Sequence, residues 1–274
     1  VRYRYGGGLN HNVGARAITE VNTIVTTFPT TTTEAEKIAV RSSLDVVNIV
    51  RASGGDAEPT LDEMRASISS ANQFQGRIVS KQDVLARIYT LPTEFGRVFR
   101  AGISENPINP LSSRLFILCR DITGKLDTAP DTLKNNIANY LNEFRLVSEA
   151  IDILDGKVLN FGIRFQIVTK PGVNKEQTIQ TIINELSEMY EVKNMQIDQP
   201  LVLDDMRYLI LQNPGVVSLR NLEVFPRAGG IADRIYGSES FDKTSIVKNG
   251  LVVGSSGSIF EIKYPEFDIL GSTT

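Results

Sequence analysis

The chain has 274 residues, with 29 Lys and Arg against 32 Asp and Glu, one His, one Cys and no Trp. Its net charge of −3 argues against a nucleic-acid-binding protein, because such proteins usually carry a basic excess. One Cys excludes an intramolecular disulfide and a Cys-rich zinc site, and one His excludes a multi-histidine metal cluster within one chain.

The chain begins inside a strand-like run, Val1–Tyr5, without an initiating Met or a signal peptide. We therefore expect the C-terminal portion of a longer protein. The longest apolar runs, such as Ser113–Leu118, have the length of a strand and fall short of the roughly 18 residues that span a bilayer.

The N-terminal third is predicted to be mostly strand and loop. Ala17–Phe28 is enriched in β-branched residues and predicts a strand, and Pro29–Thr33 predicts a loop. Glu34–Val50 begins like a helix and ends like a strand, so both interpretations stay open.

Two short helices and two strands are expected next. Thr60 with Glu63 and Ser80 with Asp83 are N-cap patterns in which each side chain covers an exposed backbone N–H of the other. The strands that follow are predicted at 98–103 and 113–121.

Longer elements are predicted in the second half of the chain. A helix opening at Pro130 and running to Val147 carries apolar residues at helical spacing. A β-α-α-β unit is then expected, with a sheet covered on one face by helices: strand 162–169, a helix capped by Asn174, helix 203–212 and strand 216–225. Asn249-Gly250 predicts a hairpin, and a closing strand is expected at 258–264.

The predicted fold class is therefore α+β. A β-strand-rich part with short helices, residues 1–125, is followed by a second domain, residues 126–274. The second domain contains the small β-α-α-β unit and ends in the C-terminal hairpin.

The glycines, the histidine and the cysteine each suggest a chemistry that a simpler role explains better. Gly6-Gly7-Gly8 resembles a phosphate-binding loop, but no Gly-Lys-Ser/Thr follows, and a turn explains it equally well. His11 is a candidate general base without an evident nucleophile. Cys119 lies in an apolar strand, where a buried inert thiol is expected rather than a nucleophile.

Three carboxylate pairs suggest a hydrolase: Asp62-Glu63, Asp152/Asp155 and Asp204-Asp205. Each has a structural explanation. Adjacent carboxylates on a helix point in different directions, and a first helical turn favours negative charge. The segment Asp121–Asp127 has too few acidic residues at alternate positions for a calcium loop. We therefore predict no catalytic, cofactor-binding or metal-binding residues and no cofactor.

Two further features suggest a nucleic acid or a membrane as the binding partner. Arg2, Tyr3, Arg4 and Tyr5 alternate in a way that suits single-stranded nucleic acid, although an alternating strand explains them without a wider basic patch. The helix at 130–147 has few basic residues on its polar face, which disfavours an anionic lipid surface.

Several motifs follow one another in an order typical of one family. They are the turn Ser53-Gly54-Gly55-Asp56-Ala57-Glu58, the helix Leu61–Arg65, the segment Gln75–Asp83, the turn Thr169–Gly172, the helices 178–191 and 204–211, and Asn213–Val217. In this order the chain resembles the baseplate J-like proteins of contractile-tailed phages. Val84 stands where that family often has Tyr, and Gly76 stands where Asn is common. Arg2–Gly8 and Ile259–Pro265 further resemble the large baseplate wedge subunits of myoviruses.

The resemblance implies a structural, non-enzymatic subunit of a virion tail baseplate. In that family two copies pair, and wedges join into a six-fold ring that controls sheath contraction after assembly in the host cytoplasm. No nucleic acid, membrane or small-molecule substrate is implied. A wedge component of a bacterial contractile injection apparatus is an open alternative, as is a tail-associated hydrolase or glycan-binding module. We expect subunit contacts on the exposed parts of 133–147 and 241–264.

Overall fold

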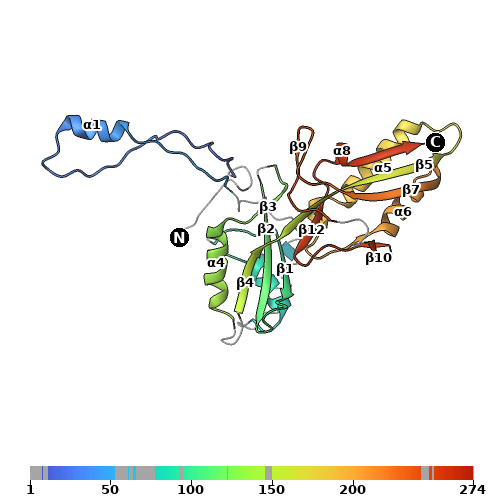
Figure 1. The fold of residues 1–274 in the computed structure, drawn as a ribbon, viewed down its shortest axis with the longest axis horizontal. Coiled ribbons are helices and arrows are strands. Elements are labelled where there is room, and N and C mark those ends of the chain that lie inside the picture. Colours follow the sequence, from blue (N-terminus) through green and yellow to red (C-terminus); the bar gives the residue numbers. More distant parts are fainter. Residues whose placement is uncertain are drawn as a thin grey trace.

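The fold is described from a computed structural model. It describes residue 8 and residues 12–52, 61, 64–65, 78–92, 95–121, 123–145, 150–241, 247–248 and 250–273. The predicted α+β class is confirmed (Figure 1). The helices are α1 (Glu34–Ser42), α3 (Lys81–Tyr89), α4 (Asp131–Asn142), α5 (Lys175–Met189), the 3₁₀ helix η3 (Val192–Asn194), α6 (Leu203–Gln212) and α8 (Pro265–Asp268).

The strands form four sheets within the described residues. They are β1 (Arg100–Glu105), β2 (Ser112–Arg120), β3 (Leu126–Thr128), β4 (Ala150–Asp155), β5 (Lys157–Thr169), β6 (Leu201–Val202), β7 (Val216–Pro226), β8 (Gly230–Ile231), β9 (Arg234–Ile235), β10 (Val247–Lys248), β11 (Leu251–Val252), β12 (Ser258–Glu261) and β13 (Ile269–Thr273).

The first large sheet is built around β2. Strand β1 pairs antiparallel with β2 over Ser113–Leu118. Strand β4 pairs parallel with Ser112–Ile117 of β2, and β3 pairs antiparallel with Leu118–Arg120. The second large sheet is built around β5, which pairs parallel with β12 and β13 and antiparallel with β7. Helices α5 and α6 contact β13 and β7 respectively, and they also contact each other.

Strand β2 is buried on both faces because each face belongs to a different hydrophobic core. Leu115, Ile117 and Cys119 pack with α3 and α4 in one core. Leu118 points to the opposite face and packs with β5, α5 and α6 in the other core. The continuous apolar run of β2 therefore reflects two cores that share one strand.

Strands β4 and β5 are almost one continuous strand, since only Gly156 separates them. The first part lies in the sheet of β2 and the second part in the sheet of β5, so the two sheets have no linker between them (Figure 1). Helix α4 and strand β4 pack with β1 and β2, although they follow residue 125. The division into domains at 125 and 126 stays a prediction.

Several local signals are confirmed. Ser80 and Asp83 form a complete capping box at α3, and Asn174 accepts hydrogen bonds from the first turn of α5. Strands β10 and β11 pair antiparallel as the predicted hairpin requires, with Gly250 at a φ of 79°, while Asn249 lies outside the described residues. The cap predicted at Thr60 and Glu63 lies outside the described residues.

Several predicted boundaries are wrong. Helix α4 has Pro130 as its N-cap but ends at Asn142, five residues before Val147, where Glu143 N donates to Tyr140 O (3.3 Å) and Phe144 N donates to Leu141 O (3.0 Å), which tightens the last turn. The strand predicted at 258–264 ends at Glu261. Pro265 opens α8, and Asp268 Oδ2 accepts a hydrogen bond from Tyr264 N (2.9 Å) at the start of this helix. The last strand to pair with β5 is therefore β13.

The strand predicted at 17–28 is also wrong. Residues 12–52 form an arm that leaves the body, carries α1 at its far end and returns (Figure 1). Its two legs are joined near the body by two backbone hydrogen bonds, Arg16 N to Asn48 O (2.7 Å) and Ala52 N to Val13 O (2.8 Å). Two backbone hydrogen bonds do not make the regular series of a β-sheet. The β-branched residues of 17–28 therefore lie in an irregular extended leg. The ambiguous segment 34–50 is helical first and extended afterwards.

Gly156→Ala tests the shared position of the two sheets. A Cβ at Gly156 would lie 2.7 Å from Cγ of Leu118, which is 0% exposed and has no room to move. We expect the free energy of unfolding to fall by about 1–3 kcal/mol, as for other overpacked cores. Urea unfolding measures this change. Gly230→Ala is the control, since nothing lies within 4 Å of its added Cβ; equal effects of both substitutions would contradict the prediction.

Candidate functional site

The structure does not bring the predicted carboxylate pairs together into a site. Asp152 and Asp155 are three residues apart on β4, and an odd separation places them on opposite faces of a strand. Asp152 accepts hydrogen bonds from Asn106 and Ser112, and Asp155 accepts one from Lys134 (2.8 Å). Each carboxylate therefore has a structural role of its own.

Asp204 and Asp205 lie in the first turn of α6, where the helix dipole favours negative charge. Asp204 forms an ion pair with Arg207 one turn later, at 2.9 Å. Asp121 accepts hydrogen bonds from the N–H groups of Thr123 (2.8 Å) and Lys125 (3.0 Å), so it closes a turn.

The remaining candidates are buried or lie outside the described residues. The thiol of Cys119 is 1% exposed and lies 3.8 Å from the backbone oxygen of Arg97, as expected of an inert core residue. Residues 2–7, His11, Asp62 and Glu63 lie outside the described residues, so their predicted roles stay predictions. Among the described residues, no group of three or more His, Cys, Asp or Glu side chains is placed to hold a metal ion. In the same part of the chain, no helix has the length and apolar character to cross a membrane.

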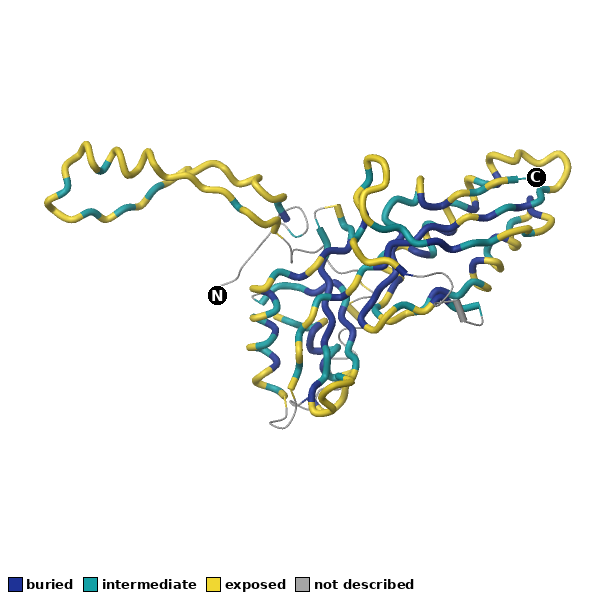
Figure 2. The backbone as a smooth tube through the Cα atoms, in the orientation of Figure 1, coloured by how far each residue is buried: buried dark blue, intermediate teal, exposed yellow. Residues whose placement is uncertain are grey.

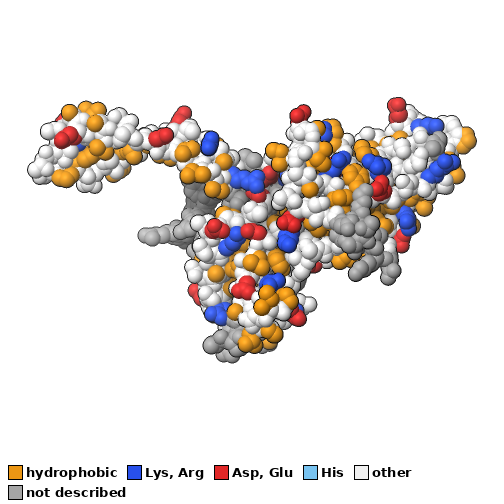
Figure 3. Space-filling model, viewed as in Figure 1, with side chains coloured by type: hydrophobic (Ala, Val, Ile, Leu, Met, Phe, Trp, Pro, Cys, Tyr) orange, Lys and Arg blue, Asp and Glu red, His pale blue; other side chains and the backbone are white. Residues whose placement is uncertain are grey.

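The arm is an exposed surface that the sequence analysis did not predict. Of residues 12–52 only Asn12 is buried (Figure 2). Ten large hydrophobic side chains of the arm are exposed, including Val25 (92%) and Ile49 (82%), and hydrophobic side chains are visible along it in Figure 3. The ten are Ile18, Val21, Val25, Ile38, Val40, Leu44, Val46, Val47, Ile49 and Val50.

Polar contacts hold the shape of the arm. Asn48 bridges the two legs, because its side chain donates to Gly14 O (2.8 Å) and accepts from Ile18 N (3.0 Å). At the far end, Arg41 of α1 donates to Thr26 Oγ1 (3.3 Å). The arm is therefore shaped by hydrogen bonds while its apolar side chains face outward.

Polar contacts between described residues fix the arm to the body. Asn12 Nδ2 donates to the backbone oxygen of Arg120 at the end of β2 (3.3 Å). Arg51 forms an ion pair with Asp127 of β3, a carboxylate whose side chain is only 6% exposed. The direction of the arm therefore depends on the edge of the first sheet.

A buried carboxylate links the two sheets. Glu261 of β12 accepts hydrogen bonds from Leu126 N of β3 (3.1 Å) and from Asn160 Nδ2 of β5 (2.8 Å), and it is 1% exposed. Burial raises the pKa of Glu261, and these two hydrogen bonds and the charges of Lys263 and Lys125 oppose that rise.

Known proteins offer little direct comparison. No protein-family model matches the chain, and no curated protein matches it. Among solved structures, the chain is similar to a chain of the cryo-EM structure of the anti-feeding prophage baseplate, 6-fold symmetrised, with a TM-score of 0.46 and 13% sequence identity. The similarity covers 66% of this chain and 41% of that chain. With a TM-score below 0.5, the likeness by itself assigns neither a fold family nor a function.

Arg51→Ala tests the attachment of the arm. The substitution leaves Asp127 without its ion-pair partner, so the base of the arm opens more often. A partly exposed ion pair contributes up to about 1 kcal/mol, so hydrogen exchange at the Ala52 amide, which donates to Val13 O at the base, should accelerate up to about fivefold. Lys81→Ala, which breaks the ion pair with Glu105 elsewhere, is the control. Equal exchange rates in both variants would show that Arg51 does not hold the arm.

Glu261→Gln tests the buried carboxylate. A raised pKa in the folded state means that the folded protein binds more protons than the unfolded chain at pH values above the ordinary value of 4.5. The free energy of unfolding should therefore fall as the pH rises from 4.5 through the raised pKa, and the Gln variant should lack this fall. Urea unfolding between pH 4.5 and 7.5 measures the difference.

The control for this experiment is Glu185→Gln, which removes an exposed carboxylate on α5. Its stability should follow that of the unmodified chain across the same pH range. If the curve of Glu261→Gln also ran parallel to that of the unmodified chain, Glu261 would not be the group whose pKa is raised.

Proposed function

We propose that this chain is a structural subunit of a contractile-tail baseplate, of the baseplate J-like type, and that its arm binds neighbouring subunits. The ordered motifs from Ser53 to Val217 support the family. The observation that carries the role is the arm, in which ten large hydrophobic side chains are exposed.

The energetics of the arm favour a partner. Fixing the backbone of one residue costs about 1–2 kcal/mol, and burial of apolar surface normally offsets this cost. The 41 residues of the arm, 12–52, bury none of their large hydrophobic side chains against their own chain. A typical stable interface uses about 20–30 residues on each side, so the arm is long enough to supply one.

We propose that two copies pair, that wedges join into a six-fold ring around the tail tube, and that the chain has no enzymatic activity. The virion tail is then its location, with assembly in the host cytoplasm. Closed rings require surfaces that fit one another in a fixed orientation, and an arm anchored to a sheet edge supplies such a surface. The parts of 133–147 and 241–264 that are exposed are further proposed contacts.

No described feature favours the hydrolase or glycan-binding alternative. The apolar face of α4 is used by its own core, through Leu133, Ile137 and Leu141. Of the carboxylates that suggested catalysis, Asp152, Asp155 and Asp204 each have a polar partner. Asp205 lies in the first turn of α6, where the helix dipole favours its charge, and Asp62 and Glu63 lie outside the described residues.

Removing the arm tests the proposed role. Arg16 and Asn48 lie in hydrogen-bond contact, so residues 17–47 can be replaced by a short glycine linker without moving the body. We expect the midpoint of thermal unfolding to change little, because the arm contributes nothing to either hydrophobic core. Sedimentation velocity at high micromolar concentration should show association of the full chain and loss of that association without the arm.

Point substitutions on the arm refine this experiment. Val25→Ser with Ile49→Ser should weaken association about tenfold or more, because burying one such side chain contributes about 1.5–3 kcal/mol. Ile108→Ser is the control, since Ile108 is 85% exposed in the loop between β1 and β2. A full chain that stays monomeric throughout would overturn the proposed pairing. A low-resolution image of the assembled particle would then show whether the chain occupies a six-fold ring.

A further inference from the structure

Strand β4 is an edge strand with an open backbone. Within the described residues it pairs only with β2, and Ala150 N donates to Leu111 O (3.1 Å) where that pairing begins. Since successive N–H groups of a strand point to opposite sides, the N–H groups of Ile151 and Ile153 point away from β2. Among the described residues, the outward N–H and C=O groups of these two isoleucines have no hydrogen-bond partner. The edge can therefore accept a further strand.

A groove lies beside this open edge, between β4 and α4. It has a volume of about 230 Å³, and helix α4 and strand β4 are neighbours in Figure 1. Its lining is apolar on the strand side and small, apolar or polar on the helix side: Ile151, Ile153, Ala138, Leu141, Asn142 and Arg145. A strand added to such an edge forms hydrogen bonds through its backbone and places alternate side chains in the groove.

The first leg of the arm has the pattern of a strand without a partner. Along residues 23–28, exposed side chains alternate with half-buried ones. The half-buried side chains face α1, since Arg41 donates to Thr26 Oγ1 (3.3 Å) and its guanidinium lies 5.6 Å from the centre of the Phe28 ring. In the part of the chain that the structure describes, no backbone group of residues 19–28 forms a hydrogen bond.

We propose that the first leg of the arm pairs as an added strand with β4 of a second copy of this chain. The arm leads away from its own body in Figure 1, so the edge that it meets belongs to another copy. The charges fit this match. Glu20 is the one charged residue of 17–28, and Arg145 is the one charged residue among the described residues that line the groove. The inference rests on the proposed binding of the arm to neighbouring subunits and specifies the surface that it binds.

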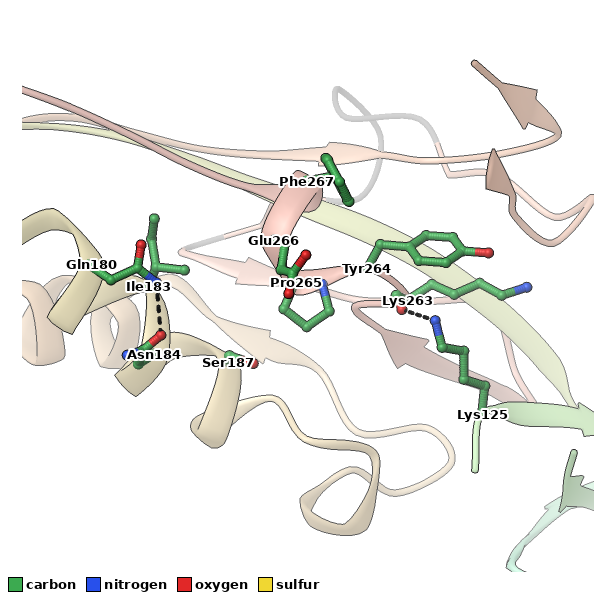
Figure 4. Close-up of a pocket in the computed structure, with 10 residues that line it drawn as sticks. All are labelled: Lys125, Gln180, Ile183, Asn184, Ser187, Lys263, Tyr264, Pro265, Glu266 and Phe267. Carbon is green, nitrogen blue, oxygen red and sulfur yellow. Dashed lines mark hydrogen bonds between the residues drawn. The ribbon is translucent and has the colours of Figure 1, made fainter. Parts of the chain in front are cut away.

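Two other places on the body fit a strand less well. At the opposite edge of the first sheet, Tyr89 OH donates to Ala101 O (3.3 Å) and accepts from Ala101 N (3.0 Å), so this part of β1 already has a partner. A larger cavity, of about 720 Å³, lies between α5 and the segment 263–267, with Lys125 at one end (Figure 4). None of its described lining residues belongs to a strand, so it offers side chains but no open strand edge.

A peptide of residues 17–28 tests the inference on the full chain. The peptide is labelled and N-acetylated, and fluorescence anisotropy measures its binding. We expect saturable binding that Ala138→Gln weakens about tenfold, because the longer side chain fills the groove. Asn139→Gln is the matched control, since it places the same side chain one position later on α4, at an exposed residue that does not line the groove.

Two proline peptides test the backbone pairing without any change to the protein. Thr23→Pro and Ile24→Pro each remove one backbone N–H, and the N–H groups of successive residues point to opposite sides of a strand. One of the two substitutions therefore removes a hydrogen bond to β4 and should weaken binding about three- to tenfold, while the other should change it less. Equal affinities of both proline peptides and the unsubstituted peptide would overturn the strand pairing.

Sedimentation velocity of the same variants separates this inference from the proposed function. Association of the full chain should fall in Ala138→Gln and not in Asn139→Gln. If association needed the arm but were the same in both variants, the leg would bind elsewhere, and this inference would be overturned while the proposed function stood. A peptide of 17–28 that bound no better than one of scrambled sequence would also overturn the inference, because the groove would then not select the arm.

Discussion

The burial of both faces of β2 determines how the rest of the molecule is arranged. A strand that is apolar on both faces needs a core on each side, and here the two cores are built by different parts of the chain. Leu118 anchors one side and Ile117 the other, both at 0% exposure. Gly156 fits against Leu118 only because it has no Cβ, so the chain can pass from β4 straight into β5 at this point. The two sheets therefore behave as one body.

This body is what gives the arm a defined direction. Both anchors of the arm, at Asn12 and Arg51, attach to β2 or β3, and β3 is in turn tied to β12 and β5 through Glu261. Without such cross-links, any movement of β3 relative to the rest of the body would change the direction of the arm. Here its base belongs to a sheet that is cross-linked by a buried carboxylate.

The sequence predicts those parts of the fold that depend on neighbouring residues. The caps at Ser80 and Asn174 and the turn at Asn249-Gly250 are local signals, and the elements that they begin or join are present. Pairing between distant segments is harder to predict. The strand predicted from residue 162 in fact begins at Lys157, because its first residues pair with β12 about a hundred positions later. The extended leg at 17–28 has the composition of a strand but no partner to pair with.

The exposure of the arm could not be predicted from the sequence, for a physical reason. A list of residues does not show exposure, and the apolar residues of the arm have the same composition as core strands. Contacts between distant residues are as hard to predict as exposure, since Lys125 and Lys263 are 138 positions apart and meet beside the place where Glu261 of β12 accepts a hydrogen bond from β3. The same buried carboxylate ties β3, which carries the ion-pair partner of Arg51, to β12 and β5. The base of the arm therefore rests on a contact that no local sequence pattern reveals.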